Sequence, residues 1–135
     1  MSIDATTLRH FLHILGAAVW VGGQITMAGL LPAIRRAEED VRKGLARQFN
    51  RVAWPFFGVA FVTGLWNVME RDPGDASNGW NAALMIKLLL VAASGVAAWM
   101  HTRATARSAI AMWGAVGGTA ALGSLLFGSI LLTNA

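Results

Sequence analysis

Four long apolar segments, separated by polar stretches, constrain this chain more than any other feature. They cover about residues 7–31, 52–69, 80–101 and 110–132. Since about 20 apolar residues in a helix cross the hydrocarbon core of a bilayer, each segment approaches or exceeds the length of a transmembrane helix. With 56% hydrophobic and 13% charged residues, the chain is too apolar for a soluble globule. The sequence therefore predicts an all-α integral membrane protein, residues 1–135 forming a single four-helix transmembrane bundle within the lipid bilayer.

Basic residues are concentrated on one side of these predicted spans. The connection 32–51 and the turn after the third span carry most of the chain's lysines and arginines, whereas the opposite side carries Arg9 and Arg71. By the positive-inside rule, both basic connections face the cytoplasm and both termini lie outside the plasma (inner) membrane. Topology and anionic lipid account for this charge, so no nucleic-acid partner is expected.

The basic connection 32–51 is itself expected to be helical. Glu38 and Glu39 lie four residues before Arg42 and Lys43, a spacing at which opposite charges pair along one helix face. Pro55 is expected in the first turn of the second span, where a helix tolerates proline.

Small residues in the fourth span predict close helix packing. Two pairs have a four-residue spacing, Gly114 with Gly118 and Ser124 with Gly128. Such spacing lets helices approach closely, either within one bundle or between protomers, so a homo-oligomer is expected.

Ionisable side chains are costly within a membrane, by about 2.5–3.5 kcal/mol on insertion scales, and each is a functional candidate. The predicted spans contain His10, His13, Lys87 and His101, and no acidic residue. At 1.5 Å per residue from the outer end of its span, His13 lies about 9 Å deep and Lys87 about 10 Å deep. His101 lies about 31 Å from that end, near the cytoplasmic surface. The sequence thus predicts that His13 and Lys87 lie level with each other and apart from His101.

His13 is the leading candidate for a metal ligand. Its helix face continues, in steps of three and four residues, through Gly16, Trp20, Gly23 and Met27. The small residues on this face leave room beside the large rings, so Gly16 and Trp20 are candidates to contact a flat cofactor. Neutral imidazole ligates haem iron and also suits copper. The alternative is a buried histidine hydrogen-bonded to a neighbouring helix. His10, one turn nearer the surface, is expected at the interface, within reach of a haem propionate.

Lys87 lies too deep for its charge to be easily accommodated. An ammonium group there requires an anion, a carbonyl group or deprotonation, so Lys87 is the second candidate for chemistry. The alternative is that the side chain extends outward past Trp80 to reach water.

A weaker metal site is predicted near the cytoplasmic surface. Met27, Met100 and Met112 fall near the level of His101, and thioethers select Cu(I). The alternatives are that the methionines fill apolar space and that His101 is interfacial.

Several short segments resemble a known group of membrane proteins. They are L-H-I-L-G at 12–16, V-W-V-G-G at 19–23, L-P-A-I-R-R at 31–36, R-x-F-N-R at 47–51, T-G-L-W at 63–66 and M-I-K-L-L-L-V at 85–91. In this order they resemble the copper-resistance D (CopD-like) membrane proteins over the first three spans. They are also similar to the related HemJ-type protoporphyrinogen oxidases, four-helix membrane proteins that bind haem b and use a histidine of the first span and a lysine of the third. The resemblance implies that His13 and Lys87 occupy those two functional positions.

These observations lead to three hypotheses. The first is a haem b-binding membrane redox protein in which His13 ligates iron and Lys87 holds a propionate, a substrate or the other face of the iron. It would transfer electrons, with a quinone or another redox partner, or act as a haem-dependent oxidoreductase. The second is copper uptake or tolerance at the plasma membrane. The third is a non-catalytic subunit of a larger membrane complex.

Overall fold

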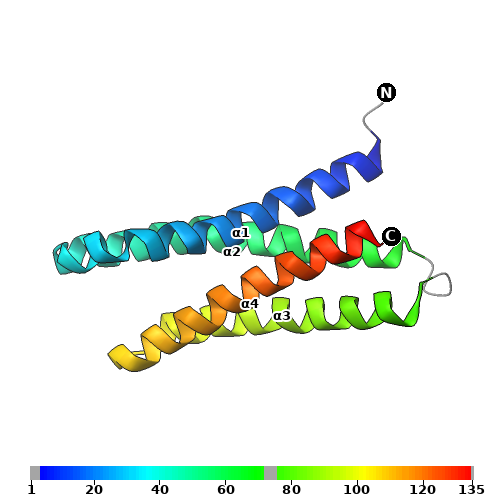
Figure 1. Cartoon of the computed structure of the whole chain (residues 1–135). Coiled ribbons are helices and arrows are strands. Elements are labelled where there is room, and N and C mark those ends of the chain that lie inside the picture. The colour runs from blue at the N-terminus through cyan, green and yellow to red at the C-terminus, as the bar shows by residue number, and fades with distance from the viewer. Residues whose placement is uncertain (1–3, 72–75, 135) are drawn as a thin grey trace. The chain divides into compact units, whose positions relative to one another are not determined.

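The computed structural model describes residues 4–71 and 76–134, and these residues form four α-helices and no strand. The helices are α1 (Ala5–Arg36), α2 (Glu39–Met69), α3 (Asn78–Arg103) and α4 (Arg107–Thr133), shown in Figure 1. Each is long and apolar enough to cross a membrane. The prediction of an all-α, multi-pass membrane protein is confirmed. The membrane in which the chain resides and the side on which its termini lie stay predictions.

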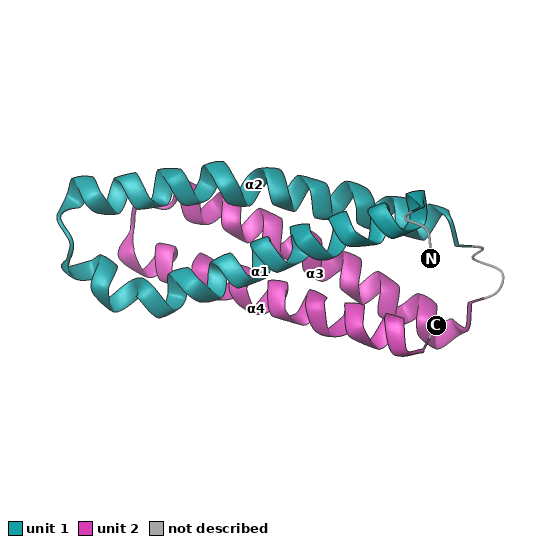
Figure 2. Cartoon of the chain, turned by 90° about the horizontal axis from the view of Figure 1, so that it is seen from above, with its two compact units in different colours: residues 1–71 teal, residues 72–135 magenta. Residues whose placement is uncertain are grey.

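The chain divides into two compact units, Met1–Arg71 and Asp72–Ala135 (Figure 2). Within the first unit α1 packs against α2, and within the second α3 packs against α4. Each unit is therefore a hairpin of two helices. The expectation that residues 1–135 form one domain stays a prediction.

The connection 32–51 is divided between two helices instead of forming a separate segment. α1 continues through Pro32 to Arg36, and α2 begins at Glu39. The expected helical pairing is confirmed by Lys43, whose Nζ lies 2.6 Å from Glu39 Oε1. At 1.5 Å per residue, α1 and α2 extend about 48 and 46 Å, well beyond the ~30 Å hydrocarbon core.

The expectation for Pro55 was wrong, because this residue lies inside α2 and not in its first turn. The helix begins earlier because Glu39 and Asp40 lie in its first turn, where negative charge favours the helix dipole. The Glu39–Lys43 pair supports the same turn, so the polar start of α2 continues directly into its apolar part.

The first unit is packed through a close approach at Gly16. A Cβ atom on this residue would lie 2.7 Å from Phe56 O and 2.8 Å from Ala60 N, so the backbones of α1 and α2 are nearly in contact. One turn further along α1, the buried Trp20 ring packs against Phe57 at 4.5 Å and Trp54 at 5.4 Å between ring centroids. Glycine and aromatic contacts together determine how α1 lies on α2.

The second unit is packed through the small residues of α4. The buried Ser94 Oγ of α3 donates a hydrogen bond to Gly117 O at 3.1 Å. A Cβ on Gly114 would lie 3.4 Å from the His101 ring, and one on Gly128 would lie 3.2 Å from Lys87 Nζ. The prediction of close helix packing along α4 is confirmed within the hairpin, and the homo-oligomer stays a prediction.

Candidate functional site

His13 contacts the backbone of α2 directly. Its Nδ1 lies 2.8 Å from Ala60 O, and the ring is half-buried between the two helices. Because a carbonyl oxygen only accepts hydrogen bonds, Nδ1 is the donor in this contact. In the neutral ring, this geometry selects the tautomer whose lone pair, the one able to bind a metal, is on Nε2.

Two further residues of α2 lie against the imidazole. Thr63 Oγ1 lies 3.4 Å from His13 Nδ1 and donates its own hydrogen bond to Val59 O at 2.6 Å. A Cβ atom on Gly64 would lie 2.8 Å from His13 Cε1 and 3.2 Å from Nδ1. The ring thus lies in a notch that only glycine provides. We call Ala60, Thr63 and Gly64 the imidazole notch.

Sequence reasoning missed the role of the imidazole notch. The T-G-L-W segment was identified only as part of a resemblance, whereas its first two residues contact His13. The pairing depends on the register of α1 against α2, and no local pattern in the sequence specifies this register.

Arg9 forms a second polar cluster, one turn before His13 on α1. The residue is only 8% exposed, and its Nη1 lies 3.7 Å from Glu70 Oε2. Its guanidinium carbon lies 5.6 Å from the centroid of the Trp66 ring, whose Nε1 donates a hydrogen bond to Glu70 Oε1 at 3.1 Å. Sequence reasoning treated Arg9 only as a topology signal. Its i, i+4 spacing from His13 was the available clue that both share one helix face.

The other predicted cofactor contacts of the first span differ in their environment. His10 is exposed, as an interfacial residue would be. Gly16 and Trp20 are buried and face α2, which fills the space beside them with the Phe56–Ala60 backbone and the Phe57 ring. Their predicted contact with a cofactor stays a prediction.

Lys87 lies on the face of α3 that contacts α4. The side chain is half-buried and extends along Gly128, where a Cβ would lie 3.2 Å from Nζ and 3.5 Å from Cε. Among residues 4–71 and 76–134, no hydrogen bond or ion pair is found for its amine. The structure therefore gives Lys87 a position beside Gly128 and, among the described residues of its unit, no counter-ion. Because His13 and Lys87 belong to different units, their predicted meeting at one depth stays a prediction.

His101 is held in a manner that resembles His13. Its Nδ1 lies 2.8 Å from Ile110 O of α4, and the ring is exposed at the end of α3. Met100 is half-buried in the same helix, Met112 is exposed on α4, and Met27 belongs to the other unit. The copper site predicted from these residues stays a prediction.

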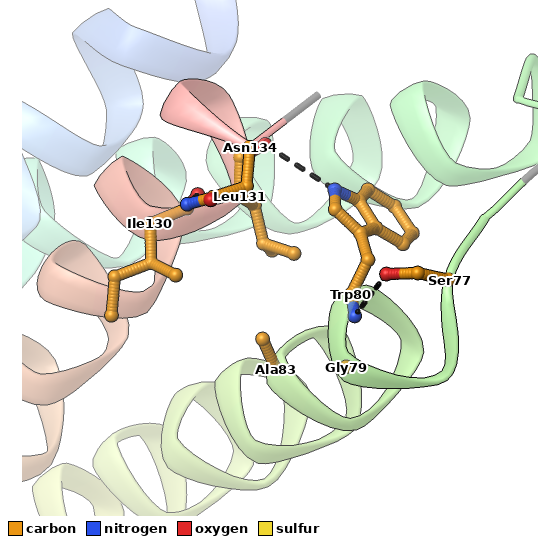
Figure 3. Close-up of a pocket in the computed structure, with 7 residues that line it drawn as sticks. All are labelled: Ser77, Gly79, Trp80, Ala83, Ile130, Leu131 and Asn134. Carbon is orange, nitrogen blue, oxygen red and sulfur yellow. Dashed lines mark hydrogen bonds between the residues drawn. The ribbon is translucent and has the colours of Figure 1, made fainter.

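A shallow pocket lies where the second hairpin opens (Figure 3). It has a volume of about 270 Å³ and is lined by Ser77, Gly79, Trp80, Ala83, Ile130, Leu131 and Asn134. The Trp80 indole Nε1 donates to Leu131 O at 3.3 Å, and the Trp80 backbone N–H donates to Ser77 Oγ at 3.2 Å. The first of these bonds holds the indole against the end of α4, and the second caps the start of α3, so the pocket lies at the open end of the hairpin.

Comparison with known proteins identifies no relative. No family model matches the chain, no curated protein matches its sequence, and no solved structure matches its fold.

Proposed function

We propose that this chain is a haem b-binding integral membrane redox protein in which His13 ligates the iron through Nε2. One observation carries the proposal: the 2.8 Å hydrogen bond between His13 Nδ1 and Ala60 O. Histidines that bind metals usually donate their other ring N–H to a carbonyl or carboxylate, which fixes the tautomer and raises the basicity of the ligating nitrogen. His13 has this arrangement before any metal binds.

The imidazole notch supports the proposal in two further ways. The His13 ring occupies the space that a side chain at position 64 would fill, and its close contact with Gly64 limits its rotation. The hydrogen bond to Ala60 O satisfies the Nδ1 proton within the helix pair, and a hydrogen-bonded polar group is far less costly in apolar surroundings than one without a partner. The donor set thus fits a haem iron, which is commonly held by a single histidine.

Bound haem would supply one-electron oxidation and reduction of its iron. The protein's own residues would bind and orient the group, and α2 would keep water from the Nδ1 side of the ligand. Lys87 would hold an anionic group, either a propionate or an acidic substrate, because its half-buried amine has no acidic side chain in its own helix. Electrons would pass to a quinone or another redox partner, or the chain would act as a haem-dependent oxidoreductase.

The test is the visible spectrum of the detergent-purified full chain, recorded before and after dithionite, together with its copper content. We expect a Soret band that shifts on reduction and disappears in His13→Ala. A preparation that binds stoichiometric copper with no Soret band, or one that takes up neither copper nor added haemin, would contradict the proposal.

A further inference from the structure

From the contacts of Arg9 and its place on α1, we infer that Arg9 is a second anchor for the group that His13 binds. It would pair with a carboxylate of that group, and the inference therefore rests on the proposed function. Arg9 and His13 are four residues apart, so they share one face of α1 at about 6 Å along its axis. Haem carries both an iron, which His13 would bind, and propionate carboxylates, one of which Arg9 would bind, so one ligand can engage both residues.

The guanidinium of Arg9 is incompletely satisfied. Its Nε is buried and has no hydrogen-bond partner among residues 4–71 and 76–134. The contact from Nη1 to Glu70 Oε2, at 3.7 Å, is longer than a hydrogen bond. Arginine presents a planar fork of donors that matches a carboxylate through two parallel bonds. A buried arginine with one edge unused is costly, and a ligand carboxylate would remove this cost.

Glu70 is the group that a ligand carboxylate would replace. Its side chain is 57% exposed, whereas that of Arg9 is 9% exposed, so Glu70 can move into water while Arg9 stays. Trp66 holds Glu70 by one hydrogen bond and also offers its ring to the guanidinium. Arg9 would keep one carboxylate beside it in both states: Glu70 without ligand and the propionate with it.

Arg9 is better placed to bind a propionate than His10, the residue that the sequence suggested for this role. His10 is exposed, and no hydrogen bond of its ring is found within residues 4–71 and 76–134. A carboxylate held by Arg9 would be in a drier environment and would make charge-assisted bonds, which are about twice as strong as neutral ones.

The experiment compares two probes, haemin and haemin dimethyl ester, titrated into the full chain in detergent. The ester retains the iron and lacks the carboxylate charge. In Arg9→Gln we expect haemin to bind about ten- to hundred-fold more weakly, as expected for loss of a charge-assisted pair. The ester should bind as it does to the unaltered chain. Arg9→Lys keeps the charge and loses the fork, so its haemin affinity should be intermediate.

Glu70→Gln is the matched control, because it separates binding from a structural role. If Glu70 competes with the ligand, removing its charge should leave haemin binding unchanged or strengthen it. If Arg9 and Glu70 only hold α1 to α2, Glu70→Gln should weaken both probes as Arg9→Gln does, and that result overturns the inference. Equal weakening of haemin and ester by Arg9→Gln also overturns it while His13 stands as ligand. Failure of the unaltered chain to bind either probe overturns the proposed function and this inference together.

Discussion

His13 in the first hairpin and His101 in the second make the same contact with different surroundings. In each, Nδ1 lies 2.8 Å from a carbonyl of the partner helix, Ala60 O or Ile110 O. In each, a glycine four residues after that carbonyl lies against the ring. The contact at Gly64 is tight, with 2.8 Å to a Cβ position, whereas that at Gly114 is ordinary at 3.4 Å.

The difference shows what the ring-to-carbonyl bond does in each place. His101 is exposed at a helix end, where water could satisfy the same groups, so its bond contributes little beyond local order. His13 lies well inside α1, half-buried, with Thr63 as an additional neighbour. Burial and the tight notch therefore mark His13 as the ring whose orientation the fold determines.

The largest effect is expected on stability, when one packing glycine in each hairpin is replaced by alanine. A methyl group on Gly16 would meet backbone atoms of α2 at 2.7 and 2.8 Å, which cannot move without separating the helices. A methyl group on Gly123 would meet the flexible end of Leu90 at 3.1 Å. We expect Gly16→Ala to cost about 3 kcal/mol or more of stability. Gly123→Ala should cost about 1 kcal/mol or less, since Ala also favours a helix.

Thermal unfolding of both variants in detergent measures this contrast. Gly22→Ala is the control in α1, because nothing lies within 4 Å of its Cβ position. Equal loss in the Gly16 and Gly123 variants would show that the two hairpins are packed alike, contrary to the account given above.

A smaller and more specific effect is expected at the two ring glycines. In Gly64→Ala, the methyl group would displace the His13 ring from the imidazole notch, at a cost of about 1–2 kcal/mol. Haem affinity should fall about tenfold or more, because residues that hold a metal-binding histidine in its orientation contribute about that much. Gly114→Ala should be tolerated, since 3.4 Å is an ordinary contact. Haemin titration of the two variants tests this prediction, and retained affinity in Gly64→Ala would exclude the notch as an orienting element.

The smallest effect concerns helix caps, which differ between the hairpins in their response to pH. Asp4 Oδ1 accepts from Thr7 N at 2.7 Å, and this backbone hydrogen bond, with one from the Thr7 hydroxyl, lowers the pKa of Asp4 from its usual 3.8. The start of α3 is capped by Ser77, which does not titrate in this range. A lowered pKa means that the Asp4 cap is fully effective above pH 3.8 and is lost as the pH falls through the lower, folded-state value.

Amide hydrogen exchange at Thr7 and Leu8 measures this fraying. Protection should fall on acidification below pH 3.8 in the unaltered chain and remain constant in Asp4→Asn, whose amide caps without titrating. Acid fraying at Trp80 to the same extent would contradict the assignment of the effect to Asp4.

Hydropathy and charge spacing predicted the helices well. Four apolar runs gave four helices, and the Glu39–Lys43 pair was anticipated because an i, i+4 interaction depends only on local sequence. The position of Pro55 within its helix was predicted wrongly because hydropathy locates only the apolar part of a span. The bounds of the helix depend on caps and polar turns outside that part.

The candidate site was predicted only in part. His13 was identified because a histidine inside an apolar run is costly, and this argument needs no partner. Its bond to Ala60 and its notch at Gly64 required the register of two helices separated by about 50 residues, which no local pattern specifies. Arg9 was overlooked because its position near the start of α1 made exposure the simpler expectation, whereas it is buried against α2.

The absorption spectra of His13→Ala and His101→Ala, recorded side by side after addition of haemin, show whether His13 ligates the haem iron. Both variants lose one ring-to-carbonyl hydrogen bond of equal length, so they are matched in what they remove from their hairpins. We expect the Soret band and its shift on reduction to disappear in His13→Ala and to persist in His101→Ala. An unchanged spectrum in His13→Ala, or equal loss in both variants, would contradict this expectation.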